Sequence, residues 1–197
     1  MNILKINSSA KITGSRSREL TKTLSEKLQS ISSGNIIDRD LTKNLQFLNE
    51  EMIDRFYTPE ELLDANDRKI LSPSDNLTNE LINSDVIVIG APMYNFGISG
   101  MLKSYLDQVC RLGKTFSTNP QGFEGLLKGK IAYIIITTGG TPLGGEDDFM
   151  TDYLKKVLSF IGVTDIRFFT VDKFDPEQAK DAMLKVNKEI DALALPL

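Results

Sequence analysis

A hydroxyl-rich segment near the N-terminus is the first part of the chain that could bind a ligand. Residues 7–17 read Asn-Ser-Ser-Ala-Lys-Ile-Thr-Gly-Ser-Arg-Ser. Hydroxyl groups and free backbone amides at the start of a helix bind anions, and the helix dipole adds to the attraction. Serines also simply cap helices, but this density of hydroxyls favours a phosphate site. The segment contains neither Gly-Lys-Ser/Thr nor Gly-x-Gly-x-x-Gly, which disfavours ATP and dinucleotides as tightly bound cofactors.

Two further loops combine residue types that suit a flat ligand. Residues 90–99 contain a methionine, a tyrosine and a phenylalanine within four positions, and such side chains are costly to leave in water. They could also fill the core of the domain itself. Residues 137–142 contain two adjacent glycines, where the backbone can approach a ligand closely. A phosphate site, an aromatic wall and a glycine wall together describe a pocket for a planar mononucleotide.

The chain has no histidine and a single cysteine, Cys110. The missing histidines exclude Ser-His-Asp and Cys-His nucleophiles and histidine-ligated zinc or iron sites. A single cysteine excludes an intrachain disulfide and a cysteine-based zinc cluster, so we predict no metal site. Cys110 falls near the apolar face of a predicted helix and is expected to be a core thiol. Any enzymatic chemistry must therefore come from a group other than histidine.

The charge balance and hydropathy point to a cytoplasmic protein with small-molecule ligands. The formal net charge is −4, so the chain lacks the excess of positive charge that binds nucleic acid or an anionic membrane. The longest apolar run within a predicted strand, residues 131–136, is much shorter than the roughly 20 residues of a membrane span. The N-terminus enters a strand without the pattern of a signal peptide. We expect no nucleic-acid partner and no membrane partner.

The elements that must position the three loops alternate between strands and helices. Strands are predicted at residues 3–6, 35–37, 86–89, 131–137 and 166–171. Helices are predicted at residues 17–31, 102–109, 149–161 and 176–193. A capping pattern at Thr58-Pro59-Glu60-Glu61 predicts a further helix, which Ser72-Pro73 interrupts and which ends near Asn83. Residues 40–57 show no clean period.

This alternation predicts one α/β domain over residues 1–197, a doubly wound sheet of five parallel strands with helices on both faces. Five strands favour the flavodoxin-like strand order 2-1-3-4-5 over the six-stranded dinucleotide fold. Ligands of such sheets bind outside the carboxyl ends of the strands, where the strand order reverses. The three loops follow the first, third and fourth strands, so we expect them to meet at that edge.

The segment after the third strand carries the most specific motif. It reads Ala91-Pro92-Met93-Tyr94-Asn95-Phe96 and is followed by Leu102-Lys103-Ser104-Tyr105-Leu106-Asp107. This motif resembles the signature of the FMN-dependent NADH-azoreductases, which are also described as quinone reductases, and the resemblance extends over essentially the whole chain. It implies a flavodoxin-like enzyme that binds FMN and uses NADH or NADPH to reduce quinones and azo compounds by two-electron, ping-pong hydride transfer.

The resemblance also implies roles for individual residues. The phosphate of FMN would be bound by Ser9, Ser15, Arg16 and Ser17. The isoalloxazine ring would be lined by Met93, Tyr94, Asn95, Phe96, Thr137, Thr138, Gly139 and Gly140. Asn95 and Gly140 are expected to tune the flavin, and Phe116 and Phe160 to face the substrate. Thr138 stands where relatives often carry an arginine, which bears on substrate preference.

A homodimer is also expected. The resemblance implies a flavin near a subunit boundary, and Phe47, Phe56 and Tyr57 are difficult to bury on one domain of this size. These side chains come from the irregular segment 45–57, which therefore needs a partner surface.

The residues alone leave two other functions open. The first is a flavodoxin-type electron carrier with no substrate of its own, and the second is a small-molecule binding module with no redox role. Electron carriers tend to be shorter and more acidic, whereas this chain has residues 40–57 and 112–130 beyond the minimal fold. Asp38 and Asp40 suggest a receiver-type acidic pocket, but that pocket also needs an aspartate where Gly90 stands.

Overall fold

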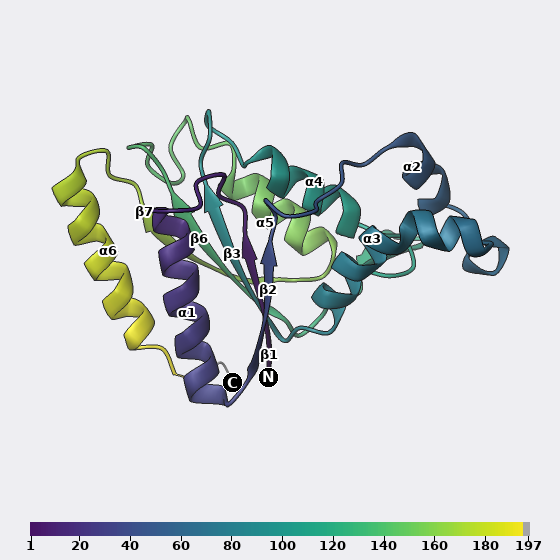
Figure 1. Cartoon of the computed structure of the whole chain (residues 1–197), viewed down its shortest axis with the longest axis horizontal. Coiled ribbons are helices and arrows are strands. Elements are labelled where there is room, and N and C mark those ends of the chain that lie inside the picture. Colours follow the sequence, from purple (N-terminus) through teal and green to yellow (C-terminus); the bar gives the residue numbers. More distant parts are fainter. Residues whose placement is uncertain (195–197) are drawn as a thin grey trace.

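A computed structural model describes residues 1–194, and residues 195–197 of the predicted domain lie outside the described part. The elements are β1 (Asn2–Asn7), α1 (Arg16–Ser32), β2 (Asn35–Asp40), α2 (Glu50–Phe56), a 3-10 turn (Glu60–Leu62), α3 (Ala65–Ile82), β3 (Val86–Pro92), α4 (Gly100–Val109), β4 (Phe116–Asn119), β5 (Gly122–Gly125), β6 (Ile131–Thr137), α5 (Thr151–Phe160), β7 (Asp165–Val171) and α6 (Pro176–Asp191). Figure 1 shows them around a central twisted sheet.

The central sheet has five strands in the order β2-β1-β3-β6-β7. All four neighbouring pairs are parallel. Because β4 and β5 are not part of this sheet, its strands follow the order 2-1-3-4-5, and the predicted fold class is confirmed. Every residue of β3 is buried, which explains its uninterrupted apolar sequence, since a central parallel strand is covered on both faces.

Helices cover both faces of the sheet (Figure 1). Val86 and Val88 of β3 pack with α1 and α6 in one core cluster. Ile87 and Ile89 point to the other face and pack with α3, α4 and α5 in a second cluster. This alternation follows from the two-residue period of a strand. The two cores hold the sheet rigidly, so the loops at its carboxyl edge start from fixed positions.

The sequence prediction is partly wrong between residues 40 and 82: the helix that ends near Asn83 is present, but its start differs, and the segment without a clean period contains α2. The predicted helix at Thr58 is a single 3-10 turn, and α3 begins at Ala65. The helix begins at this point because Asp64 and Asp67 form a capping box. The Asp67 amide donates to Asp64 Oδ1 at 2.8 Å, and the Asp64 amide donates to Asp67 Oδ2 at 3.2 Å. Pro73 lies inside α3 without ending it, at the cost of one backbone donor.

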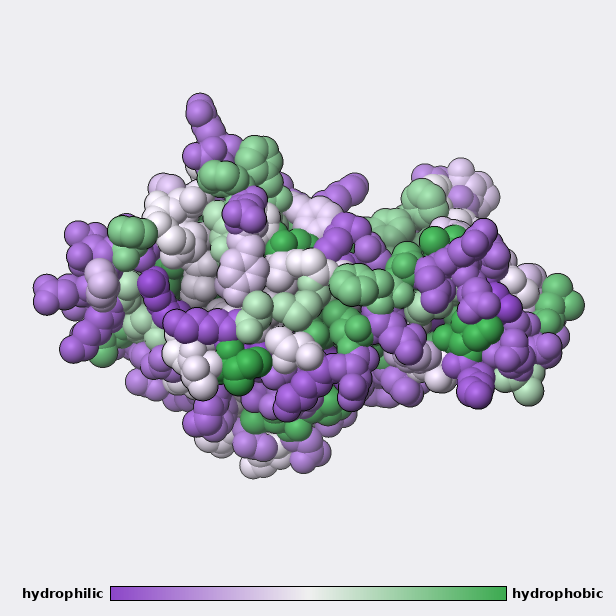
Figure 2. All heavy atoms as spheres, turned by 45° about the horizontal axis from the view of Figure 1, so that its top comes forward, coloured by the Kyte–Doolittle hydropathy of each residue, from purple (hydrophilic) through white to green (hydrophobic). Residues whose placement is uncertain are grey.

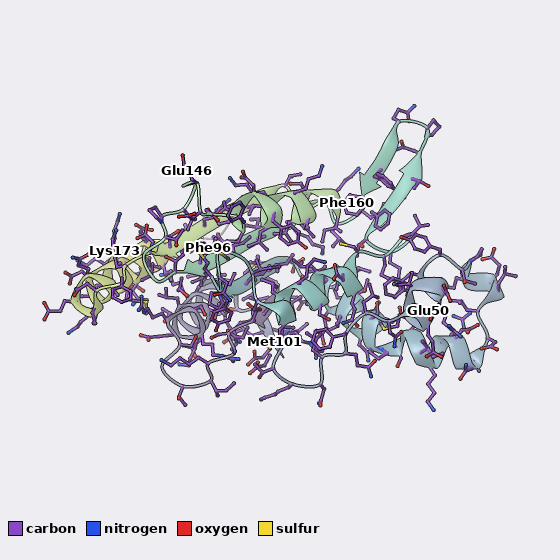
Figure 3. All side chains as sticks on the ribbon, turned by 90° about the horizontal axis from the view of Figure 1, so that it is seen from above. Glu50, Phe96, Met101, Glu146, Phe160 and Lys173 are labelled. Atoms are coloured by element: carbon purple, nitrogen blue, oxygen red, sulfur yellow. The ribbon has the colours of Figure 1, made fainter. Side chains whose placement is uncertain are left out.

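A two-stranded antiparallel hairpin, β4 and β5, is a further element that the sequence analysis missed. It projects from the body of the molecule beyond α5 (Figure 3). Its base fits tightly against the turn after α5, since a Cβ atom on Gly125 would lie 2.1 Å from the backbone nitrogen of Gly162. Only glycine permits this approach, which fixes where the hairpin leaves the domain.

Candidate functional site

Three loops enclose an open cavity of about 250 Å³ at the carboxyl edge of the sheet. The loops follow β1, β3 and β6, which are the three that the sequence singles out. The lining residues are Ser9, Lys11, Gly14, Ser15, Arg16, Pro92, Met93, Tyr94, Thr137, Thr138 and Gly139. Eight of the twelve residues that the resemblance assigns to FMN therefore share one cavity.

The phosphate end of this cavity is a cluster of three hydroxyls. Ser15 Oγ donates to Ser9 Oγ at 3.0 Å and lies 3.2 Å from Ser17 Oγ. Ser15 is also the N-cap of the 17-residue helix α1, and its side chain accepts a hydrogen bond from the Arg18 amide. Hydroxyl donors at the positive end of a helix suit a phosphate dianion. Ser17 does not line the cavity but is buried directly behind Ser15.

Arg18 supports this cluster, although the sequence analysis did not identify it. Its guanidinium donates to the carbonyl oxygens of Ser9 at 2.8 Å and Lys11 at 3.1 Å. It also makes a bidentate pair with Asp40 at 2.8 Å for both bonds. These bonds lower the pKa of the Asp40 carboxyl well below its usual range. The loop after β1 is thereby tied to the end of β2 before any ligand binds.

Arg16 has a second role besides lining the cavity. Its Nη1 donates to the carbonyl oxygen of Lys173 at 3.0 Å, in the loop between β7 and α6. The guanidinium therefore joins a fourth loop to the phosphate end, a contact that the sequence could not reveal. Among residues 1–194 the remaining guanidinium nitrogens have no hydrogen-bond partner, so they stay available to an anion.

The loop after β3 makes a tight turn around Asn95 and Phe96. The Tyr94 amide donates to the Gly97 carbonyl at 2.9 Å, and the Gly97 amide donates back at 3.2 Å. Asn95 and Phe96 have φ values of +49° and +71°, a left-handed conformation that costs a residue such as Phe96 roughly 1–2 kcal/mol and that asparagine tolerates better. The turn exposes both side chains at the rim of the cavity without making them part of its lining. Strain of this kind gathers at functional sites.

The loop after β6 forms the glycine wall. A Cβ atom built on Gly139 would meet nothing within 4 Å, so its backbone is open to a flat ligand. The Gly140 amide, which we expected to tune the flavin, instead donates to Thr138 Oγ1 at 3.1 Å. Thr138 is buried and its hydroxyl donates to the Thr141 carbonyl at 2.8 Å. The Thr138 side chain therefore stabilises the conformation of this loop through hydrogen bonds to its backbone.

Phe116 and Phe160, which we expected to face the substrate, do not reach this cavity. They pack against each other with ring centroids 4.6 Å apart, and Phe123 of the hairpin packs on both at 5.9 and 5.6 Å. Figure 3 shows Phe160 near the base of the hairpin and Phe96 well away from it. Phe123 has 69% of its surface exposed. The hairpin thus presents a separate aromatic cluster to the surroundings of the chain.

Other chemistry is limited within residues 1–194. No group of three or more acidic, cysteine or histidine side chains in this range could hold a metal ion. None of the helices described there has the length and apolar character needed to cross a membrane. Burial raises the pKa of the Cys110 thiol to about 11, which keeps it protonated and a poor nucleophile near neutrality. The thiol packs at the edge of the core, as expected.

Comparisons with known proteins agree with this geometry. The family model described as "Flavodoxin-like fold" matches residues 1–194. A protein of Hahella chejuensis named FMN-dependent NADH:quinone oxidoreductase 1 is 42% identical over 178 residues, which cover 89% of this chain and 87% of the relative. A protein of the same name from Jannaschia sp. is 40% identical over 98% of both chains.

Solved structures share the fold. The crystal structure of azoreductase AzrA superimposes with a TM-score of 0.88 at 21% identity and covers 97% of each chain. An FMN-dependent NADH-azoreductase of Bacillus anthracis, solved in complex with FMN, has a TM-score of 0.83 at 22% identity and covers 98% of this chain and 99% of its own. At these identities the likeness concerns the fold.

Proposed function

The chain belongs to the flavodoxin-like family that includes the FMN-dependent NADH:quinone oxidoreductases, and on that premise we propose that it binds FMN and transfers two electrons from NADH to quinones and azo compounds. The observation that carries this proposal is the cavity at the carboxyl edge of the sheet. One end offers the hydroxyls of Ser9 and Ser15, with Ser17 behind them, and a helix N-terminus for a phosphate. The other end offers an aromatic and a glycine wall for a flat ring.

The donor set at each end fits the two parts of FMN. Ser9, Ser15 and Ser17, together with the first amides of α1, would hold the phosphate, and Arg16 would add a positive charge at the rim. The ring would lie between the Met93–Phe96 segment and the Thr137–Gly139 segment. When bound, FMN supplies the hydride chemistry that the side chains of this protein lack.

The protein contributes orientation and electrostatics to this reaction. The Asn95 carboxamide stands at the rim on a strained turn, where it would donate to negative charge that develops at the pyrimidine end of the ring. Donor and acceptor would occupy the same face in turn, which gives ping-pong kinetics. Since no histidine is present, we expect the rate of hydride transfer to vary little between about pH 6 and 8.

We also propose that the protein acts as a homodimer. Phe47 and Tyr57 have 73% and 69% of their surfaces exposed, as does Phe123 at 69%, and Figure 2 shows hydrophobic side chains on the end of the molecule where α2 and α3 project. Phe56 is an exception, because it is half-buried against the Arg111 guanidinium, 4.1 Å from its ring centroid. The aromatic cluster of Phe116, Phe123 and Phe160 lies apart from the sheet-edge cavity of its own chain. These side chains would therefore face substrate only in the site of a partner chain.

The alternative function, an electron carrier without a substrate, is less well supported, because the relatives at about 40% identity are named as oxidoreductases. A steady-state assay distinguishes the two. We expect the FMN-loaded protein to oxidise NADH with menadione or an azo dye as acceptor, and to do so faster than free FMN at the same concentration. An electron carrier would give no turnover above free FMN.

We expect the enzyme to work in the cytoplasm, where NADH is available.

A further inference from the structure

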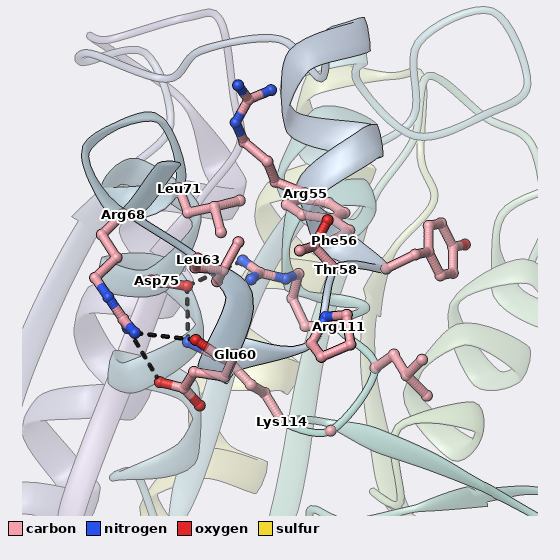
Figure 4. A pocket seen from close by; sticks show the side chains of 14 residues that line it. Arg55, Phe56, Thr58, Glu60, Leu63, Arg68, Leu71, Asp75, Arg111 and Lys114 are labelled. Carbon is pink, nitrogen blue, oxygen red and sulfur yellow. Dashed lines mark hydrogen bonds and ion pairs between the residues drawn. The ribbon is translucent and has the colours of Figure 1, made fainter. Parts of the chain in front are cut away.

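A second cavity, of about 280 Å³, lies at the other end of the molecule from the cavity at the carboxyl edge of the sheet, which we call the cradle. It is enclosed by the end of α2, the 3-10 turn, the first half of α3 and the turn after α4 (Figure 4). None of its lining residues belongs to the cavity at the sheet edge. The proposed flavin chemistry gives these residues no role, although one of them, Tyr57, is also part of the proposed dimer surface.

Two cations in this cavity share one carboxylate. Arg111 Nη1 donates to Asp75 Oδ1 at 3.0 Å, and Lys114 Nζ donates to the same oxygen at 2.8 Å. The other two arginines of the lining have carboxylates of their own. Arg68 pairs with Glu60 at 3.4 Å, and Arg55 pairs with Asp67 at 2.7 Å. The positive charge of Arg111 and Lys114 is therefore only partly neutralised by Asp75.

Arg111 is the more unusual of the two cations, because only 5% of its side chain is exposed. Nη1 also donates to Ser74 Oγ at 2.6 Å, whereas Nε, which is fully buried, has no acceptor among residues 1–194. Burial lowers the pKa of this guanidinium, and Asp75 acts in the opposite direction. A buried cation with an unused donor is costly, so a second acceptor would be favourable here.

Apolar side chains form one wall of the cavity. Phe56 lies over the Arg111 guanidinium and holds its plane in one orientation. The side chains of Leu63 and Leu71 contribute further walls around it (Figure 4), and Pro59 also lines the cavity. A volume of about 280 Å³ is near the lower end of the range for small-molecule sites, roughly 300–1,000 Å³. The chemistry therefore suits an anion with a compact apolar body.

We propose that this cavity binds a small organic monocarboxylate, with its carboxylate against Arg111 and Lys114 and its apolar body against Phe56, Leu63 and Leu71. Carboxylates pair well with guanidinium and ammonium donors, and a neutral ligand would leave the partly neutralised charge unchanged. The site is independent of the proposed flavin chemistry, so either proposal can fail without the other. The competing interpretation is that the cluster only anchors the turn after α4 to α3.

Calorimetric titration of the FMN-saturated protein with benzoate and with benzamide tests this proposal. The two probes have the same ring, but only benzoate carries a charge. We expect benzoate to bind and benzamide to bind at least about tenfold more weakly, which is the effect of losing one charge-assisted contact. The protein without FMN should bind benzoate equally well, which separates this cavity from the cradle at the sheet edge.

Three variants locate the binding. Lys114→Met should weaken benzoate at least about fivefold, whereas Lys128→Met, which removes an exposed lysine paired with Glu124, should not change it. Leu63→Trp should fill the cavity and abolish binding while leaving every charge in place. Circular dichroism and the melting temperature confirm that each variant is folded.

Four results would overturn the proposal. They are no heat with benzoate at millimolar concentration, equal affinity for benzoate and benzamide, unchanged affinity in both Lys114→Met and Leu63→Trp, and competition between benzoate and FMN. The first three would leave the cluster as a structural anchor, and the fourth would assign the benzoate to the cradle.

Discussion

The side-chain oxygens of Ser9 and Tyr94 lie 3.3 Å apart, although 85 positions separate the two residues in the chain. The phenol oxygen of Tyr94 also accepts a hydrogen bond from the Ala10 amide at 3.2 Å. These contacts join the hydroxyl cluster after β1 to the aromatic turn after β3. The two ends of the cradle are thus held at a fixed separation, which reduces the ordering that a ligand must impose when it binds.

The first prediction concerns the phosphate end. We expect the Ser15→Ala, Ser17→Ala double variant to bind FMN at least about tenfold more weakly, because each charge-assisted hydrogen bond is worth roughly 1.5–3 kcal/mol and about 1.4 kcal/mol already gives that factor. Quenching of flavin fluorescence on titration measures the dissociation constant. Ser30→Ala, near the other end of α1 and exposed, is the matched control. Unchanged affinity in the double variant would mean that the phosphate binds elsewhere.

The second prediction concerns the ion pair between Arg18 and Asp40, whose side chains are 15% and 17% exposed. Because Arg18 lowers the pKa of Asp40 in the folded state, the pair stabilises the fold fully above the unfolded carboxyl pKa of about 4. This contribution declines as the pH falls below that value and disappears only below the folded pKa. We expect Asp40→Asn to lower the free energy of unfolding by about 2 kcal/mol at pH 7, between the values for exposed and buried pairs.

Urea denaturation at pH 7 and at pH 3 measures this effect. The difference between wild type and Asp40→Asn should shrink at the lower pH, because the unfolded wild-type chain then takes up a proton at Asp40 and part of the pair's contribution to stability is lost. Asp38→Asn, which removes the more exposed carboxylate of β2 that pairs with Lys5, serves as the comparison and should have a smaller effect. A difference for Asp40→Asn that does not depend on pH would show that Arg18 does not stabilise the charged form.

The third prediction separates the side chain of Asn95 from its backbone. With φ at +49°, this position suits glycine, so Asn95→Gly should preserve the turn while it removes the carboxamide. We expect flavin reduction by NADH to slow by a factor of about 10–100, which corresponds to the loss of one hydrogen bond to a charged group. The melting temperature should stay close to that of wild type. Stopped-flow absorbance of the FMN band measures the rate. A variant that reduces FMN as fast as wild type would exclude a role for this amide.

The fourth prediction concerns the oligomeric state. Light scattering should give the mass of two chains, because the exposed side chains of Phe47 and Tyr57 need a partner surface. Phe47→Ser combined with Tyr57→Ser should shift the protein toward the mass of one chain. Leu184→Ser, at an exposed position on α6, should leave the mass unchanged. A fully active FMN-bound species with the mass of one chain would contradict the proposed dimer.

The sequence predicts the central sheet well because burial dictates its residues. Val86 to Ile89 must be apolar on both sides in a central parallel strand, and the loops that follow such strands meet at one edge whatever their sequences. The three-loop cradle could therefore be predicted from strand periodicity and loop composition alone. The interactions that support the cradle could not be predicted in this way, since Arg18 and Asp40 are 22 positions apart and only the fold brings them together.

The peripheral elements were harder to predict for a different reason. The hairpin β4–β5 has two strands of four residues each, and Gly125 is required there by a contact with Gly162 rather than by any local pattern. The pattern at Thr58-Pro59 resembles a helix start, but the capping box that forms in the structure is the one between Asp64 and Asp67. The pairing of Phe116 with Phe160 likewise depends on the hairpin's position.

Anaerobic mixing of the FMN-loaded protein with NADH, followed by a quinone, tests the central claim most directly. We expect about one FMN per chain to be retained through gel filtration, NADH to bleach the visible absorbance of the flavin within the turnover time, and the quinone to restore it. Retained FMN that NADH cannot bleach, or a protein that retains no FMN at all, would contradict the claim.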